Sequence, residues 1–237
     1  MIAFTTFISL AVSVPLLTVS GSALKRSGCS LKGHTTPSLP APLVAPTDAL
    51  SWVGLAIGTQ NYTCSSAGTY TNVGALAELF DVSCLVQTSI FPALQDIAIA
   101  AWEAAPPTVT AAEVIKSLHG LTTPAILGQH YYVVNPVSGI GINPKWDFTS
   151  QGSLAGNKEA FVVAAKVNGA SAPTGSKDID WVQLGALAGA PALAGELAKE
   201  VYRTDTRLGQ PPASCTAGSA EIVVKYAAKY YGFGGSV

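Results

Sequence analysis

The residues of this chain best suited to acid–base chemistry are its three histidines, His34, His119 and His130. We expect His34, in a proline-rich stretch, and His119, at the end of a predicted helix, to be solvated. His130 stands in the aromatic run GQHYY with Asp147 downstream, and a histidine–aspartate pair could act as general acid and base. A histidine in such a strand is more often packed and hydrogen-bonded within the sheet. We therefore predict that His130 is structural and not catalytic.

The chain lacks the motifs of several familiar enzyme classes. The run Gly139–Pro144 begins like the dinucleotide-binding pattern G-x-G-x-x-G, but Pro144 replaces the third glycine and no strand–helix–strand unit surrounds it. No G-x-S-x-G nucleophile motif occurs. Asp147, Asp178 and Asp180 could supply a glycosidase pair, but nothing singles out two of them. Three scattered histidines and the lack of a C-x-x-C pair predict no metal site, and we expect no cofactor.

The four cysteines, Cys29, Cys64, Cys84 and Cys215, are an even number. In a secreted chain this number predicts two disulfides, because thiols in oxidising compartments pair. Four cysteines allow three connectivities, and their spacing alone does not choose among them.

Secretion is predicted by the N-terminus. Residues 1–23 are apolar and uncharged, as in a signal peptide, although a positive n-region is lacking. A membrane anchor is the alternative, but Pro15 and scattered hydroxyls shorten the apolar run. Lys25-Arg26 resembles a processing site, so residues 24–26 would form a short propeptide and the mature chain would begin at Ser27. The chain has one N-x-[ST] sequon, at Asn61, which could carry a glycan or stay unmodified because Cys64 crowds it.

The net charge of the chain limits the classes of partner that it is expected to bind. Removing residues 1–26 takes away two cations and no acidic residue, so the formal net charge moves from −1 to −3. A mildly acidic chain without a basic stripe is not expected to bind nucleic acid or, once the signal is removed, an anionic membrane.

Many short apolar and aromatic runs, separated by turn-forming residues, predict one mainly β domain over residues 52–237. A sandwich and a barrel both fit this pattern. A proline-rich, extended lead-in precedes it over residues 27–51. The predicted strands, the second with an irregularity at Gly74, are Trp52–Gly58, Thr69–Asp81, His130–Val134, Phe161–Val167, Ile179–Leu184, Lys199–Thr204 and Glu221–Phe233.

A helical insertion interrupts these strands between Phe91 and Gly120. The segment Leu94–Glu103 is alanine-rich with helical spacing, and Thr110 to Glu113 has the form of a capping box. These signals predict two short helices, or one helix and a turn. The Ala/Leu/Gly-rich segment Val182–Gly195 predicts a loop with a helical turn.

Several ordered motifs resemble one family, the domain of unknown function 3455, which is found in secreted fungal proteins and has bacterial relatives. The resemblance covers roughly Trp52 to Phe233, with Leu208-Gly209-Gln210 in place of a Gly-Gly turn. An Ala/Pro-rich insert near Ala101–Thr110 also departs from the pattern. The motifs are GTQNYTC, GALAELFDVSCL, GQHYY, PKWDF, DIDWVQL, VYRTDTRLGQPPASC and YAAKYYGF.

The resemblance implies a disulfide pairing. The positions of Cys64 and Cys215 match those of the shorter, bacterial-like members, which implies Cys64–Cys215 and, by remainder, Cys29–Cys84. Members of this family sometimes carry a malate dehydrogenase label, which the residues of this chain do not support because the dinucleotide motif is incomplete.

Three functions compete. We favour a secreted or cell-wall protein that is not an enzyme and binds at a cell surface or host interface, with a wall glycan or host surface as partner. A secreted hydrolase using His130 with an aspartate and a structural wall component are the alternatives. The candidate binding residues are His130, Tyr131, Trp146 and Asp147.

Overall fold

The computed structural model of the chain describes residues 29–119, 125–189 and 191–237. The predicted signal peptide, the processing site and Ser27 lie outside the described residues. Among the described residues, no helix is both long and apolar enough to cross a membrane.

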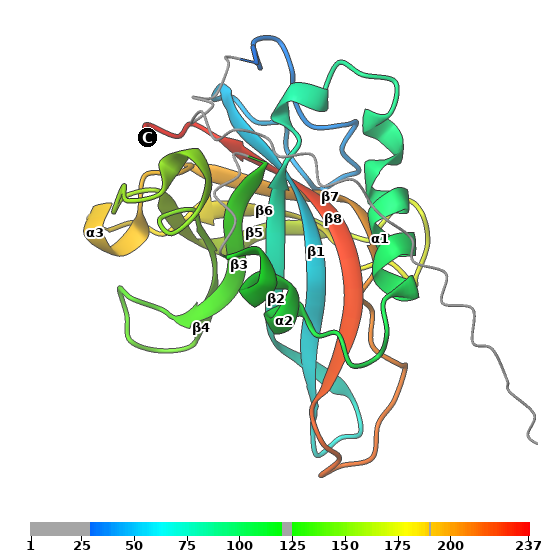
Figure 1. Cartoon of the computed structure of the whole chain (residues 1–237). Coiled ribbons are helices and arrows are strands. Elements are labelled where there is room, and N and C mark those ends of the chain that lie inside the picture. Colours follow the sequence, from blue (N-terminus) through cyan, green and yellow to red (C-terminus); the bar gives the residue numbers. More distant parts are fainter. Residues whose placement is uncertain (1–28, 120–124, 190) are drawn as a thin grey trace, which may run out of the picture.

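Eight antiparallel strands form a closed barrel in which each strand pairs with the next and β8 pairs with β1 (Figure 1). The predicted mainly β class is confirmed, and of the two architectures the barrel is the one formed. One strand, β4, was not predicted from the sequence. The strands are β1 Leu50–Cys64, β2 Tyr70–Asp81, β3 Ile126–Val134, β4 Ile142–Asp147, β5 Phe161–Ala170, β6 Trp181–Ala186, β7 Glu200–Leu208 and β8 Ile222–Phe233.

Two helices lie between β2 and β3, as the sequence predicts: α1 (Leu94–Ala104) and α2 (Ala111–Leu118). Thr110 and Glu113 form the predicted capping box, each side chain bonding the backbone N–H of the other residue. Helix α1 lies outside the barrel along β8, β7 and β1, whereas α2 covers β2 (Figure 1). A helical turn, α3 (Pro191–Ala194), falls in the segment where the sequence indicates one.

The strands bury apolar side chains on both faces. One set fills the inside of the barrel, and a second packs between the outer face and the helices. Trp102 of α1 belongs to the outer set and its indole N–H donates to the carbonyl of Gly58 at 2.8 Å. Lys225 of β8 lies over the Trp102 ring at 4.4 Å. These contacts fix α1 against the outer wall.

One end of the barrel is closed by large side chains. Trp52 and Phe148 meet edge to face with ring centroids 5.0 Å apart, and the Trp52 indole N–H donates to the carbonyl of Leu197 at 3.2 Å. The indole lies so close to Gly232 that a Cβ there would come within 2.1 Å of the ring. Glycine is therefore required opposite this plug, and any larger residue would displace it.

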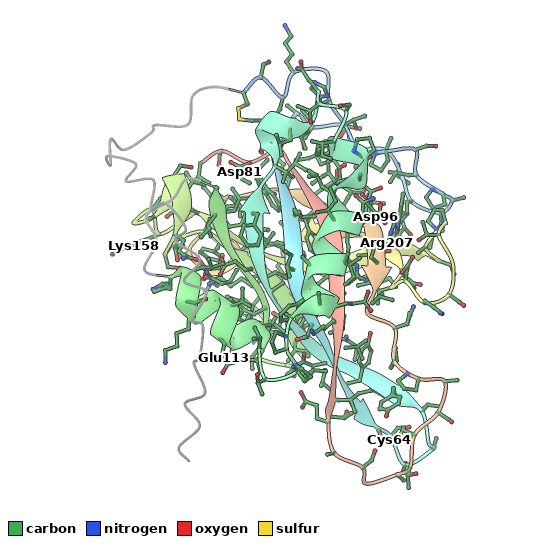
Figure 2. The ribbon with its side chains drawn as sticks, turned by 45° about the vertical axis from the view of Figure 1, so that its right-hand side comes forward. Cys64, Asp81, Asp96, Glu113, Lys158 and Arg207 are labelled. Atoms are coloured by element: carbon green, nitrogen blue, oxygen red, sulfur yellow. A yellow bond between two sulfur atoms is a disulfide. The ribbon has the colours of Figure 1, made fainter. Side chains whose placement is uncertain are left out.

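Two disulfides are present, Cys29–Cys84 and Cys64–Cys215, and these are the pairs that the family resemblance implies. Cys29–Cys84 ties the start of the described chain to the segment after β2. Cys64–Cys215 joins the end of β1 to the connection between β7 and β8, and Figure 2 shows Cys64 at the end of the barrel away from the plug.

Residues 29–49 of the proline-rich lead-in form no helix or strand, whereas Leu50 and Ser51, which the prediction placed in the lead-in, already belong to β1. The lead-in crosses the outside of the barrel, where the Tyr202 hydroxyl donates to the carbonyl of Val44 at 2.8 Å. Leu43 packs there against Trp181. On the neighbouring outer surface, Arg207 of β7 pairs with Asp96 of α1, and Figure 2 shows the two side chains together.

Candidate functional site

A cavity of about 510 Å³ opens at the end of the barrel opposite the plug. All eight strands contribute to its wall, because each sends alternate side chains inward. A cavity of this volume is within the range that holds small ligands. The residues that carry the argument below are Gln60, Tyr132, His130, Trp146, Asp180, Arg203 and Tyr230.

A β-bulge shapes the mouth of this cavity. The register between β1 and β2 shifts at Asn61 and Tyr62, so that Val73 and Gly74 together oppose one residue of β1. An extra residue in a strand reverses which side chains face inward beyond it. Tyr70 therefore lines the cavity. The predicted irregularity at Gly74 is confirmed, and Gly74 has a φ of 154°, which favours glycine.

The deep wall of the cavity is aromatic. The His130 ring stacks on Trp146 with centroids 4.5 Å apart and planes 13° from parallel. Tyr230 meets both rings at 5.3 Å, and its hydroxyl lies 3.3 Å from that of Tyr226. Tyr132 is 5.9 Å from His130 on the same strand face, as strand alternation predicts. The cavity therefore offers flat apolar surfaces with hydroxyl groups at their edges.

Arg203 of β7 brings a positive charge into the cavity. Its Nε and Nη2 donate to the backbone carbonyl of Asp180 at 3.1 and 3.0 Å. Its charge also interacts with the hydroxyls of Tyr132, Tyr226 and Tyr230. The ion pairs among the described residues do not include Arg203. The guanidinium is thus held in position by a neutral carbonyl, with no carboxylate to balance its charge.

Two further N–H groups in cavity-lining residues have no hydrogen-bond partner among the described residues. They are Gln60 Nε2 and Trp146 Nε1, and neighbouring side chains cover both. The orientation of the Gln60 amide is set by its Oε1, which accepts from Asn72 Nδ2 at 3.1 Å. Buried polar groups normally have a hydrogen-bond partner. Unpaired donors beside a cavity therefore indicate that a bound ligand could supply the missing acceptors.

His130 is held in one neutral tautomer. Its Nδ1 lies 3.0 Å from the carbonyl of Lys145 on β4, and because a carbonyl only accepts, Nδ1 carries the proton. Burial lowers the pKa of His130 to about 3, against the opposing effect of the Lys145 bond, and the charge of Arg203 adds to the lowering. The ring therefore stays uncharged near neutral pH and has a structural contact of the kind predicted.

Asp147 and Tyr131 face the opposite side of the sheet from His130. The pairing of His130 with Trp146 in the register of β3 and β4 sends these two rings inward and their chain neighbours outward. Outside the barrel, Tyr131 donates to Asp147 at 2.6 Å and Lys145 pairs with the same carboxylate at 2.8 Å. The structure therefore brings His130 and Trp146 together and separates both from Tyr131 and Asp147. A His130–Asp147 dyad is not formed.

The remaining candidates lie elsewhere. Asn61 is on the outer face of β1, where its Nδ2 donates to Glu221 at 3.2 Å. Trp52 and Trp181 are buried, so with Trp146 they form no exposed aromatic strip. No group of three or more metal-ligating side chains occurs within the described ranges.

The residue that sequence reasoning missed is Arg203. A signal was present, because Val201 and Arg203 alternate on one face of a predicted strand, and an apolar Val201 marks that face as inward. A positive charge on an inward face is rare unless it has a role. The alternation of Val201 and Arg203 indicates a binding site only once the sheet is known to close into a barrel. The inward face of an open sheet encloses no cavity.

Comparison with known proteins places the chain in a family without an assigned activity. Residues 45–234 match the sequence model of a family described as "Protein of unknown function (DUF3455)". The chain belongs to this family, as its motifs indicate. Neither the curated proteins nor the solved structures contain a match.

Proposed function

We propose that this protein is a secreted, extracellular binding protein that holds one small molecule, or the end of a larger one, inside its barrel. The observation that carries the proposal is the cavity of about 510 Å³, closed at one end, with stacked rings and unpaired donors in its wall. Concave, largely preformed sites with a few placed polar groups are typical of small-molecule binding.

Binding is favoured over catalysis by the state of His130. Its Nδ1 proton is committed to the Lys145 carbonyl, and a pKa of about 3 leaves Nε2 a poor base near neutral pH. Asp147, the expected partner, points out of the barrel. The hydrolase alternative is therefore without the His130–Asp147 pair.

The shape of the cavity limits which ligands can bind in it. A wall glycan or a host surface remains our proposed source of the ligand, but a flat polymer face would find no exposed aromatic strip to stack on within the part of the chain that the structure describes. A single ring or a chain terminus could enter the mouth and pack against Tyr132, which is partly exposed there. The two disulfides suit an oxidising, extracellular setting.

The test uses two rim substitutions that differ only in position. Ile142 lines the cavity mouth and is 47% exposed, so Ile142→Trp should narrow the mouth without disturbing the core. Ile140, 81% exposed and outside the cavity wall, gives the matched control Ile140→Trp. Secreted wild type and both variants are denatured, and the released small molecules are compared by mass spectrometry. In parallel, a fragment library is screened against each protein by ligand-observed NMR.

Compounds bound in the cavity should appear with wild type and Ile140→Trp and be lost with Ile142→Trp. Equal recovery from all three proteins would place binding outside the barrel. Failure of wild type to retain or bind any compound would refute the proposal.

A further inference from the structure

We propose that the ligand is a small carboxylic acid whose carboxylate is bound by Arg203 while its apolar part packs against the aromatic and aliphatic side chains of the cavity wall. This inference rests on the proposed function, because it names the chemical class that the cavity takes. It follows from the charges, the unpaired donors and the shape of the wall, which all point to the same ligand.

The charge of the cavity favours an anion. Arg203 and Lys166 are its two cations and Asp180 is its one carboxylate, whereas His130 is neutral. Lys166 is exposed at the rim, where it can attract an anion as it approaches. The Asp180 carboxylate is not within ion-pair distance of Arg203, although its backbone carbonyl holds that guanidinium. The excess charge is therefore positive and lies at Arg203.

The guanidinium is placed to receive a carboxylate. Its Nε and Nη2 donate to the Asp180 carbonyl, which fixes the plane of the group, and the guanidinium also bonds the Tyr230 side chain. The remaining N–H groups are left for another acceptor. Arginine remains protonated in proteins, and its planar donors match the geometry of a carboxylate better than those of lysine. A partly buried charge whose hydrogen-bonded acceptors, the Asp180 carbonyl and the Tyr230 side chain, are both neutral gains most from an anionic partner, because a carboxylate compensates for lost hydration.

Several other polar groups of the wall are donors. Gln60 and Trp146 each carry an N–H that neighbouring side chains cover and that lacks an acceptor among the described residues, so a small side-chain movement would bring it to a ligand. Burial raises the pKa values of Tyr132 and Tyr230, so their hydroxyls stay protonated and can donate. Carboxylate oxygens accept hydrogen bonds and never donate them when ionised. Asn143 and Gln210 donate their amide N–H groups to backbone carbonyls, so their oxygens, like the Asp180 carboxylate, also offer acceptors in this wall. The donors that favour a carboxylate are therefore those grouped around Arg203.

The rest of the wall is apolar and flat. Beside Trp146, the side chains of Ile179, Val182 and Leu184 line the cavity. An aromatic or short aliphatic group fits between these surfaces, with its carboxylate directed toward β7. Small aromatic and aliphatic monocarboxylic acids are thus the class that the geometry selects.

The experiment compares acids with neutral amides of the same shape. Benzoate with benzamide, and hexanoate with hexanamide, are titrated into the secreted protein at pH 7 by calorimetry. The proteins are wild type, Arg203→Gln, Arg203→Lys, Asp180→Asn and Ile142→Trp. Each variant is first compared with wild type by near-ultraviolet circular dichroism to confirm that it is folded.

Wild type should bind at least one acid at least about tenfold more tightly than its amide, as expected for a charge-assisted contact. Arg203→Gln should remove that preference and Arg203→Lys should retain part of it. Asp180→Asn keeps the backbone carbonyl that orients Arg203 and should tighten acid binding relative to amide binding. If Arg203→Gln fails to fold, this opposite effect of Asp180→Asn still decides the question.

The inference would be overturned if amides bind as tightly as their acids. It would also be overturned if the affinity for acids is the same in wild type, the Arg203 variants and Asp180→Asn. If amides bind, acids do not, and Ile142→Trp blocks the amides, the barrel is a binding site but not for carboxylates. If neither acids nor amides bind wild type, the carboxylate inference is refuted. Failure of wild type to retain or bind any compound in the rim-variant comparison would refute the binding function itself.

Discussion

Glu78 and His130 should impose opposite pH dependences on the stability of the fold. Glu78, on the outer face of β2, is fully buried, with one carboxyl oxygen accepting from Gln129 at 3.2 Å and the other unpaired among the described residues. Burial raises the pKa of Glu78 to about 7, and the Gln129 bond only partly opposes this. Burial lowers the pKa of His130 to about 3.

The signs follow from which state binds more protons. Between pH 3 and 6.5 the unfolded chain protonates His130 and the folded chain does not, so this group makes stability fall as pH falls. Between about pH 4.5 and 7 the folded chain keeps Glu78 protonated and the unfolded chain does not, so this group makes stability fall as pH rises. Each slope is about 1.4 kcal/mol per pH unit.

The two slopes should cancel between pH 4.5 and 6.5, which leaves a plateau in wild type. From pH 4.5 down to 3 the effect of His130 is unopposed and by itself should lower stability by about 2 kcal/mol. Asp147 adds to this fall, because against the effect of burial its hydrogen bonds from Lys145, Thr149 and Tyr131 lower its pKa to about 2. The variant Glu78→Gln removes the opposing slope. Its stability should therefore fall by about 2–3 kcal/mol already between pH 6.5 and 4.5.

Urea unfolding at pH 6.5, 5.5 and 4.5 measures these slopes, and the difference between the two proteins removes the contribution of groups that they share. The double variant Glu78→Gln/His130→Gln is the control. It should be flat again, because neither group can titrate. If wild type and Glu78→Gln give parallel profiles over this range, the two residues do not have the proton affinities that their burial implies.

Three other substitutions test contacts that hold the barrel. Replacing Cys64 and Cys215 together by serine should lower the unfolding free energy by about 3–5 kcal/mol, because the bond spans 151 residues. A loss below about 1 kcal/mol in urea would refute that estimate. Trp102→Phe should cost about 1–2 kcal/mol by leaving a β1 carbonyl unpaired, and unchanged thermal unfolding would contradict it. His130→Ala should lower the melting temperature, because it removes the stacking on Trp146 and the hydrogen bond to the Lys145 carbonyl. Leaving that buried carbonyl unpaired should cost about 1–3 kcal/mol of unfolding free energy. A variant that melts like wild type yet loses turnover of some substrate would show that this histidine is catalytic.

Local patterns in the sequence were sufficient for most of the elements. The capping box at Thr110 marks the start of α2, and alternating residues mark seven of the eight strands. Strand β4 was not predicted because Pro144 lies inside it, and a proline ordinarily argues against a central strand. Here Pro144 faces the cavity near the mouth, where β4 pairs with β5 only from Lys145 onward.

The site was harder to predict than the elements because it depends on which strands meet. His130 and Trp146 were selected for their types, but the strand register decides that Asp147 faces away from them. Arg203 acquires its importance only when β8 closes on β1 and encloses its charge. Such pairings join residues far apart in the chain, and single-sequence periodicity carries no information about them.

The plug formed by Trp52 and Phe148 turns the barrel into a blind pocket with a single route in and out. A bound molecule cannot be pushed through by the next one, since the incoming molecule would have to occupy the passage that the first must use to leave. Competitors can therefore capture only protein that has already emptied. The dissociation rate of any cavity ligand should then be independent of competitor concentration. A ligand that leaves slowly through the mouth therefore stays bound for the same time even when a competing ligand is in large excess.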